Sequence, residues 1–283
     1  VQGALRIDGG AVTVGSGSTF TALTETQTFD DGSTFDRTVE VIGGELSVAD
    51  AGFLASTPMF FDRASPDPRF VGLEAGQHWI VREGVAIDPD TELETVTPAT
   101  LDLGGAIVER SNGTIIIDGA EARFDAAEAM QYNHGALVLQ NGFEFNTRLN
   151  DFRNADTLVL QGASFVVEGA DGTFRNDGVL AMDGESYLRV DHFINGGFPS
   201  GETAEVVFLL DGVLDARRVT ISAGTSITGS GAVTGEIVNH GLLDIGNSPG
   251  FIETFDDFTT TAASTTRFEI LGYAAGESYD RLA

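Results

Sequence analysis

The feature that most constrains the fold of this chain is an asparagine that returns at nearly constant intervals. Successive spacings are 21, 21, 22, 19 and 44 residues, and the last equals two steps of 22. The series comprises Asn112, Asn133, Asn154, Asn176, Asn195 and Asn239. A fixed period of about 20–25 residues is typical of solenoids, in which each repeat forms one turn that cannot bury its core alone.

A second series, of turn glycines, runs in phase with the asparagines and follows five of the six by seven to nine residues. It comprises Gly119, Gly142, Gly162, Gly184 and Gly246. Apolar residues alternate beside these glycines, as at Leu158 and Leu160. Such alternation is typical of strands with one buried side. The two series predict an all-β fold, a parallel β-helix or β-solenoid with turns of about 21 residues.

The asparagine suits the corner of each turn. Its side-chain amide can bond to the backbone of its own turn, and asparagine tolerates the left-handed conformation. Amides stacked in register can also bond to one another along the stack, as in cross-β structures. We therefore predict a structural ladder of asparagines and not a ligand-binding role for them.

The repeat divides the chain into four segments. Residues 1–50 carry two strand–diglycine–strand units 34 residues apart and are predicted to form N-terminal solenoid turns. Residues 51–100 hold five of the seven prolines, which cannot donate to a strand ladder, so we expect a proline-rich insertion or flap there. Residues 101–260 are predicted to be regular β-solenoid, and residues 261–283 to be C-terminal strands of a truncated last part.

The composition excludes several classes of partner. The 43 acidic residues outnumber 15 basic ones, all arginine, which gives a net charge of −28. Nucleic acid needs a basic patch, so it is excluded as a partner. Insertion into a membrane by this chain is excluded too, because no apolar run approaches the ~20 residues of a span. Salt or divalent cations outside a cell would relieve the self-repulsion, although solubility alone explains the charge equally well.

An ordered series of short motifs lies between residues 229 and 282. They are Gly229-Ser230-Gly231, Asn239-His240-Gly241-Leu242-Leu243, Gly246-Asn247-Ser248-Pro249-Gly250, Phe268-Glu269-Ile270-Leu271-Gly272 and Tyr279-Asp280-Arg281-Leu282. This order resembles the C-terminal repeats of bacterial autotransporter passenger domains and related sorted surface proteins. The resemblance implies a right-handed parallel β-helix, a place outside or on the surface of a bacterial cell, and adhesion or surface structure more often than catalysis. It also implies that this chain is a processed or incomplete piece.

Catalysis stays open as an alternative, because the parallel β-helix also hosts polysaccharide lyases and hydrolases. A lyase needs a basic residue as proton acceptor, and a glycosidase needs two opposed carboxylates. The local acidic candidates are Asp30, Asp31, Asp36, Asp62 and Asp67. None forms a recognisable motif, so we assign no catalytic residue. The alternative function is a polysaccharide lyase or glycoside hydrolase with a site on the solenoid face near residues 51–100.

Ligand contacts and metals leave weaker signals. His78 and Trp79 are adjacent, and a tryptophan can stack on a sugar ring, although core packing is the commoner role. Neither a glycine-rich nonapeptide calcium repeat nor an EF-hand loop is present, so we predict no cofactor and at most weak calcium binding.

The sequence as a whole favours a non-catalytic, extracellular structural or adhesive protein. Exposed strand edges at the ends of a solenoid can pair with another copy, so end-to-end assembly into filaments is expected. The predicted partners are other copies of the chain, or a surface glycan or protein.

Overall fold

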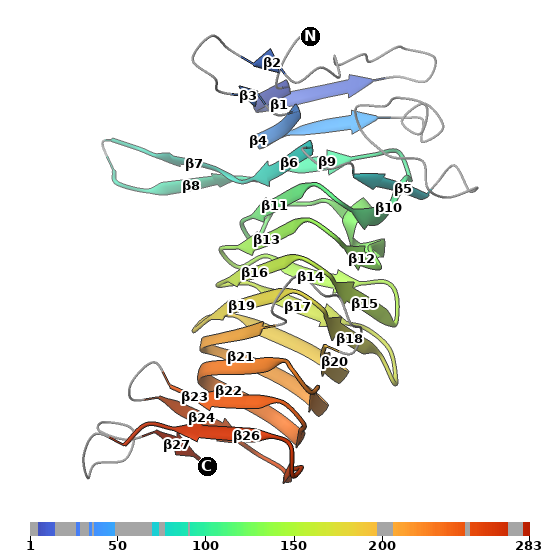
Figure 1. Ribbon diagram of the computed structural model, residues 1–283. Helices are drawn as coiled ribbons and strands as arrows, with labels where there is room; N and C mark the ends of the chain where they lie inside the picture. The colour runs from blue at the N-terminus through green and yellow to red at the C-terminus, as the bar shows by residue number, and fades with distance from the viewer. Residues whose placement is uncertain are drawn as a thin grey trace. The chain divides into compact units, whose positions relative to one another are not determined.

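The structure is a computed structural model of the chain. It describes residues 5–14, 27–28, 34–35, 37–48, 70–73, 77–89, 91–196, 206–246, 250–270 and 280–283. The predicted fold class is confirmed, because parallel strands coil into a β-solenoid whose turns are about 22 residues long (Figure 1). Asp30, Asp31, Asp36, Asp62 and Asp67 lie outside the described residues.

The chain divides into two compact units. The first unit consists of Val1–Met130 and His134–Phe143, and the second of Gln131–Asn133 and Glu144–Ala283. The parallel strands of the first unit are β1 (Leu5–Val14), β4 (Arg37–Val48), β5 (Phe70–Leu73), β6 (Gln77–Arg82), β9 (Thr100–Asp102), β10 (Ile107–Ser111), β11 (Thr114–Asp118) and β13 (Ala136–Gln140). The first unit also holds a short 3-10 helix, Asp125–Ala129, and two antiparallel hairpins, β2 (Gln27–Thr28) with β3 (Thr34–Phe35) and β7 (Gly84–Ile87) with β8 (Glu94–Thr97).

The core of the first unit is built by parallel register. Val39 on β4 pairs with Trp79 on β6, Trp79 pairs with Ile115 on β11, and Ile115 pairs with Leu137 on β13. All four side chains are at most 2% exposed. Because alternate residues of a strand face opposite sides, this register places one apolar residue of each turn directly above the next.

The segment 51–100 is only partly an insertion. Within it, β5 pairs with β10 and β6 pairs with both β4 and β11, so these strands belong to the parallel sheet. The β7–β8 hairpin is the part that departs from the solenoid, and Figure 1 shows it reaching away from the parallel strands. Residues 51–69, which hold three of the prolines, lie outside the described residues.

The second unit contains most of the regular repeats. Its strands are β12 (Tyr132–Asn133), β14 (Glu144–Thr147), β15 (Asp151–Asn154), β16 (Thr157–Gln161), β17 (Ser164–Val167), β18 (Thr173–Asn176), β19 (Val179–Asp183), β20 (Tyr187–Asn195), β21 (Val206–Ile221), β22 (Ser226–Asn239), β23 (Leu242–Ile245), β24 (Phe251–Thr254), β25 (Phe258–Thr260), β26 (Thr265–Phe268) and β27 (Arg281–Leu282).

Phenylalanine rings fill the interior of this unit. Phe152, Phe174 and Phe193 occupy equivalent positions in successive turns, with ring centroids 5.2 Å and 5.4 Å apart. Phe145 and Phe165 form a second stack with centroids 4.8 Å apart. The spacing follows from the ~4.8 Å between hydrogen-bonded strands, which brings in-register rings into direct contact.

Buried asparagines run beside the rings as a hydrogen-bonded ladder. The Asn133 amide donates to Asn154 Oδ1, Asn154 donates to Asn176 Oδ1, and Asn176 donates to Asn195 Oδ1, each at 2.8 Å. The same Nδ2 groups also reach backbone carbonyls of the following turn, such as Val179 O at 2.9 Å from Asn154. All four side chains are fully buried. Each amide thus satisfies buried groups in its own turn and the next.

The prediction for Asn112 is wrong by one residue. The His134 N–H donates to the carbonyl of Ser111, in the way that the Ala155 N–H donates to the carbonyl of Asn133. Ser111 is buried and its hydroxyl donates to Gly113 O, whereas Asn112 is only half-buried. Since neighbouring residues in a strand face opposite sides, a shift of one position turns the amide away from the ladder.

The ladder is interrupted between Asn195 and Asn239. Ile221 pairs with both asparagines in strand register, so an apolar residue occupies the ladder position of that turn. The Thr225 hydroxyl approaches this gap and donates to the carbonyls of Asn195 and Ser222 at 3.0 Å and 2.9 Å. Asn239 then caps its own corner, with Oδ1 accepting the Gly241 N–H at 2.9 Å.

Four of the five turn glycines have left-handed backbone. Gly119, Gly142, Gly162 and Gly246 have φ of 112°, 83°, 61° and 148°, which explains the preference for glycine. Gly184 has no such φ, so its identity is not required by backbone conformation. At Gly162 the N–H donates to Asp183 Oδ1 at 2.8 Å, which joins one corner to the next.

The C-terminal motifs are joined by one buried carboxylate. Asp280 is 4% exposed, and its two oxygens accept the Gly250 N–H at 2.7 Å and the Glu269 N–H at 2.5 Å. Asp280 belongs to the Tyr-Asp-Arg-Leu motif. It thereby connects Gly250, the last residue of the Gly-Asn-Ser-Pro-Gly motif, to Glu269, which directly follows β26. Residues 247–249 and 271–279 of these motifs lie outside the described residues.

We predict that Asn154→Ala lowers the free energy of unfolding by about 2–4 kcal/mol, because buried partners on both neighbouring turns lose their hydrogen bonds. Urea denaturation measures the effect. Asn112→Ala is the matched control, and its half-buried site outside the ladder predicts a loss below about 1 kcal/mol. Equal losses in the two variants would contradict the role of the ladder.

Candidate binding groove

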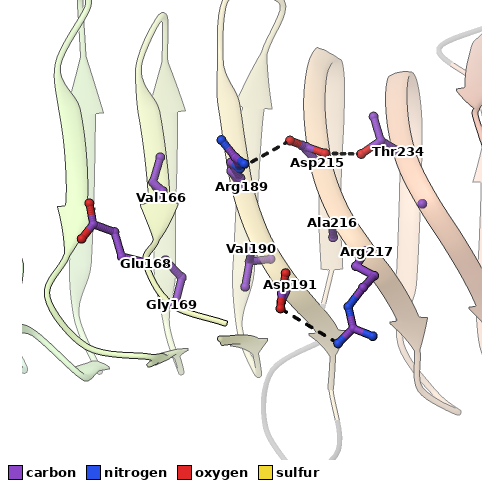
Figure 2. Close-up of a pocket in the computed structure, with 12 residues that line it drawn as sticks. Val166, Glu168, Gly169, Arg189, Val190, Asp191, Asp215, Ala216, Arg217 and Thr234 are labelled. Carbon is purple, nitrogen blue, oxygen red and sulfur yellow. Dashed lines mark hydrogen bonds and ion pairs between the residues drawn. The ribbon is translucent and has the colours of Figure 1, made fainter. Parts of the chain in front are cut away.

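A groove of about 760 Å³ lies on the outer face of β17, β20, β21 and β22 in the second unit (Figure 2). Strand alternation explains its lining. Val190 and Ala216 point inward and are buried, so the residues beside them on β20 and β21 point outward into the groove. Its charged and polar residues are Glu168, Arg189, Asp191, Asp215, Arg217 and Thr234.

The first row of the groove crosses four strands in register. Val166 pairs with Arg189, Arg189 pairs with Asp215, and Asp215 pairs with Thr234. Figure 2 shows Arg189, Asp215 and Thr234 side by side on successive turns. A cation, a carboxylate and a hydroxyl therefore follow one another at intervals of ~4.8 Å.

Asp215 has the most side-chain contacts of this row. The Tyr187 hydroxyl donates to its Oδ2, the Thr234 hydroxyl donates to its Oδ1, and Arg189 Nε lies 3.9 Å from Oδ2. Burial alone would raise the pKa of Asp215, but the hydrogen bonds from Thr234 and Tyr187 and the charge of Arg189 outweigh it and lower the pKa. The carboxylate therefore stays ionised and fixed in place.

Tyr187 shows the reciprocal effect. Burial, the hydrogen bond to Asp215 and the charge of Asp215 together raise the pKa of Tyr187 to about 12, although Arg189 acts in the opposite direction. The phenol therefore remains a hydrogen-bond donor throughout the neutral pH range.

The second row is centred on Arg217. Its Nη2 lies 3.1 Å from Asp171 Oδ1, 4.0 Å from Asp191 Oδ2 and 2.6 Å from His192 Nε2. A guanidinium only donates, so His192 Nε2 accepts this bond. Asp191 is itself placed by the Asp171 N–H, which donates to its Oδ2 at 2.6 Å. Two carboxylates and an imidazole thus hold one exposed guanidinium.

These rows place hydrogen-bond donors and acceptors side by side. The lowered pKa of Asp215 keeps this carboxylate ionised at neutral pH, so it accepts hydrogen bonds. Fixed donors next to fixed acceptors match a ligand whose hydroxyl groups both donate and accept. The groove can therefore hold a polar, uncharged or weakly charged surface.

Trp79 is packed in the core, the commoner of the two roles that the sequence allowed, and the possible ligand contact at Trp79 is wrong. Its side chain is 1% exposed and stacks on Phe124, with centroids 5.5 Å apart. His78, the preceding residue, is half-buried on the outward side of β6. The strand alternation that exposes His78 is the same that buries Trp79.

Sequence reasoning missed the groove altogether. A usable signal was present, since Arg189-Val190-Asp191 and Asp215-Ala216-Arg217 each place two opposite charges around one small or apolar residue. Such triplets predict outward-facing charges on a half-buried strand. To predict that these triplets pair with each other across turns, one would also need to know the lengths of the loops between them.

In the described part of the chain, no group of three or more histidine, aspartate and glutamate side chains is placed to hold a metal ion. Weak calcium binding therefore stays a prediction. None of the described residues forms a helix that is long and apolar enough to cross a membrane. A scan against protein-family models gave no match, and comparisons with curated proteins and with solved structures gave none either.

We predict that Tyr187 ionises near its raised pKa of about 12, and that Asp215→Asn shifts this ionisation toward the ordinary value of about 10. The contact stabilises the fold fully below pH ~10, and this contribution is lost as the pH rises through the raised pKa. Ultraviolet titration of tyrosinate, taken as wild type minus Tyr187→Phe, isolates the group, with circular dichroism verifying the fold at each pH. The more exposed Tyr132, removed in Tyr132→Phe, is the control. A Tyr187 midpoint near the ordinary value in the wild type would refute the assignment.

Proposed function

We propose that this chain is a non-catalytic extracellular surface protein, structural or adhesive, whose solenoid presents the groove to a surface glycan. The observation that carries the proposal is the groove itself, with its in-register rows of fixed arginine, aspartate and threonine side chains. Its volume of about 760 Å³ is within the usual range of small-ligand sites, ~300–1,000 Å³.

A chain of sugars suits the geometry of the groove. The rows run across the strands, so a polymer lying along them meets a new donor or acceptor every ~4.8 Å. Asp215 and Arg217 are already held by neighbouring side chains, so less conformational entropy is lost when they bind. The net charge of −28 disfavours nucleic acid as the polymer.

An extracellular setting fits two features. The chain is strongly acidic, and its C-terminal motif order resembles that of exported bacterial surface proteins. Asp280 adds a physical reason for that order, because it bonds to Gly250 and so links two of the motifs. Antibody labelling of intact cells, compared with permeabilised cells, tests the location. Labelling that requires permeabilisation would exclude it.

We predict that the purified chain is retarded by bacterial surface polysaccharides in affinity electrophoresis, and that Arg217→Gln weakens the binding about tenfold. Loss of a fixed, charged donor from the groove is the physical reason. Arg123→Gln is the matched control, because Arg123 is exposed in the first unit and bonds to nearby carbonyls. Equal binding by both variants would argue against the groove.

Release of reducing ends or unsaturated sugars during the same assay would overturn the non-catalytic part of the proposal. It would favour the alternative, a polysaccharide lyase or hydrolase. Separate alanine variants of Asp191 and of the half-buried His78 would then locate the activity in the groove or near residues 51–100.

We also propose that copies associate end to end. In a parallel stack each turn offers the next the same backbone hydrogen-bonding pattern, so a second copy can continue the stack. Negative-stain electron microscopy at low salt and with millimolar calcium is expected to show filaments, with calcium favouring them by screening acidic repulsion. Isolated particles under both conditions would exclude this mode of assembly.

A further inference from the structure

The dipeptide Asn-Gly occurs three times in the sequence, as Asn112-Gly113, Asn141-Gly142 and Asn195-Gly196. This pair is chemically reactive, because glycine has no Cβ and its backbone nitrogen can come close to the side-chain carbon Cγ of the preceding asparagine. The three pairs have the same covalent chemistry. Differences in their reactivity therefore come from the surroundings that the fold gives to each pair.

Asn141-Gly142 is the centre of a tight turn in the first unit. The Phe143 N–H donates to Gln140 O at 3.2 Å, and the φ angles of Asn141 and Gly142 are 53° and 83°. Positive φ at both central residues is the pattern of a type I′ turn, which Asn-Gly favours. The bond that closes this turn uses the Phe143 N–H, and among the described residues no acceptor is bonded to the Gly142 N–H. Both central residues are exposed.

Asn195-Gly196 is enclosed at the end of the asparagine ladder. Both residues are buried, and the Gly196 N–H donates to Asn176 O at 2.6 Å. The Asn195 amide donates to Ser226 O at 2.8 Å. Burial disfavours the charged form of a group, so a buried and hydrogen-bonded N–H loses its proton less readily than an exposed one. The Gly196 nitrogen is therefore a poor nucleophile.

Asn112-Gly113 lies between these two extremes. Asn112 is half-buried and Gly113 is buried. The next turn packs directly on this corner, since a Cβ built on Gly135 would lie 2.1 Å from Gly113 O. Water and hydroxide reach the Gly113 nitrogen less easily than the exposed Gly142 nitrogen. The structure thus ranks the three pairs, with Asn141-Gly142 the most reactive.

We propose that Asn141 is a site of spontaneous modification, namely deamidation through a succinimide ring. The Gly142 nitrogen loses its proton to base in the solvent and bonds to Asn141 Cγ. The Cγ–Nδ2 bond then breaks, and ammonia leaves with a proton taken from water. A water molecule opens the ring at either carbonyl, which gives aspartate or isoaspartate at position 141. The net reaction consumes water and releases ammonia, without oxidation or reduction.

The modification reverses the electrostatics of one corner of the first unit. Asn141 Nδ2 donates to Asp118 Oδ1 at 2.6 Å, and Arg82 Nε donates to Asp118 Oδ2 at 2.7 Å. The Asp118 side chain is only 14% exposed, so water screens it weakly from a new carboxylate at position 141. Two carboxylates then replace a donor and an acceptor. The contact between the end of β11 and the turn after β13 becomes repulsive.

The test is peptide mapping by mass spectrometry of the wild-type chain, incubated in its folded state at neutral and at mildly alkaline pH. The increase in mass that accompanies conversion of an amide into a carboxyl group is expected first at Asn141, about tenfold or more faster than at Asn195. The rate should rise about tenfold per unit of pH, because the nucleophile is the deprotonated nitrogen.

The same chain unfolded in guanidinium chloride is the matched control. There the three pairs should react at similar rates, because only the fold distinguishes them. Conversion of Asn112 or Asn195 as fast as Asn141 in the folded chain would overturn the proposal. The reaction needs no ligand, so its outcome is independent of the proposed glycan-binding function.

Asn141→Asp reproduces the aspartate product without the reaction, and aspartate also accepts a positive φ. Its melting temperature is expected to lie below that of the wild type, and the difference should shrink in high salt, which screens charges. Adding Asp118→Asn to this variant restores a donor beside an acceptor and should recover part of the loss. An unchanged melting temperature in Asn141→Asp would refute the repulsion at this corner.

Discussion

Strand register, kept unchanged from one turn to the next, is the constraint on which the rest of this structure depends. The buried asparagine amides enforce it, because each bonds both to the amide above and to a backbone carbonyl. A slip of one residue would expose Phe152 and Phe174 and leave the amides without partners. Each unsatisfied buried group costs about 1–3 kcal/mol, so the penalty falls on several turns at once.

The same register determines the electrostatics of the surface. Because the register is constant, an outward-facing arginine on one strand lies opposite a carboxylate on the neighbouring strand. Arg267, for example, donates through Nε and Nη2 to the two carboxylate oxygens of Asp244. A planar guanidinium suits this geometry better than a lysine ammonium, which is consistent with a basic complement made only of arginine. The candidate groove uses these cross-turn contacts, so its donors and acceptors are in place before any ligand arrives.

The sequence was sufficient to predict the period, the fold class and the inner asparagines from Asn133 to Asn195. It placed Asn112 one residue out of register, because the Asn-Gly motif there resembles the Asn-His-Gly of the next turn while the buried position is Ser111. Core packing was the commoner expectation for Trp79, and the pairing of β6 with β4 and β11 shows that this proline-rich region contributes a strand to the solenoid.

The groove could not be predicted because turns differ in length. Arg189 and Asp215 are 26 residues apart, whereas Asp215 and Thr234 are 19 apart, yet all three lie in one row. A register shift in β21 between Leu210 and Val213 absorbs part of the difference. A repeat of fixed length predicts which residues face inward, but it does not predict which outward residues from different turns become neighbours.

Ile221 has a consequence for how a chain of this kind can grow. Within the ladder, Asn154 and Asn176 each donate to the amide of the following turn and accept from the amide of the preceding one, so these inner members are chemically equivalent. A duplicated turn would join such a ladder without new partners, whereas a duplicated half-turn would not. Ile221 shows that one member can be replaced without loss of the strand pairing on either side. Gene duplication can therefore lengthen this solenoid by whole turns, and the duplicated turns are then free to exchange a ladder asparagine for another residue.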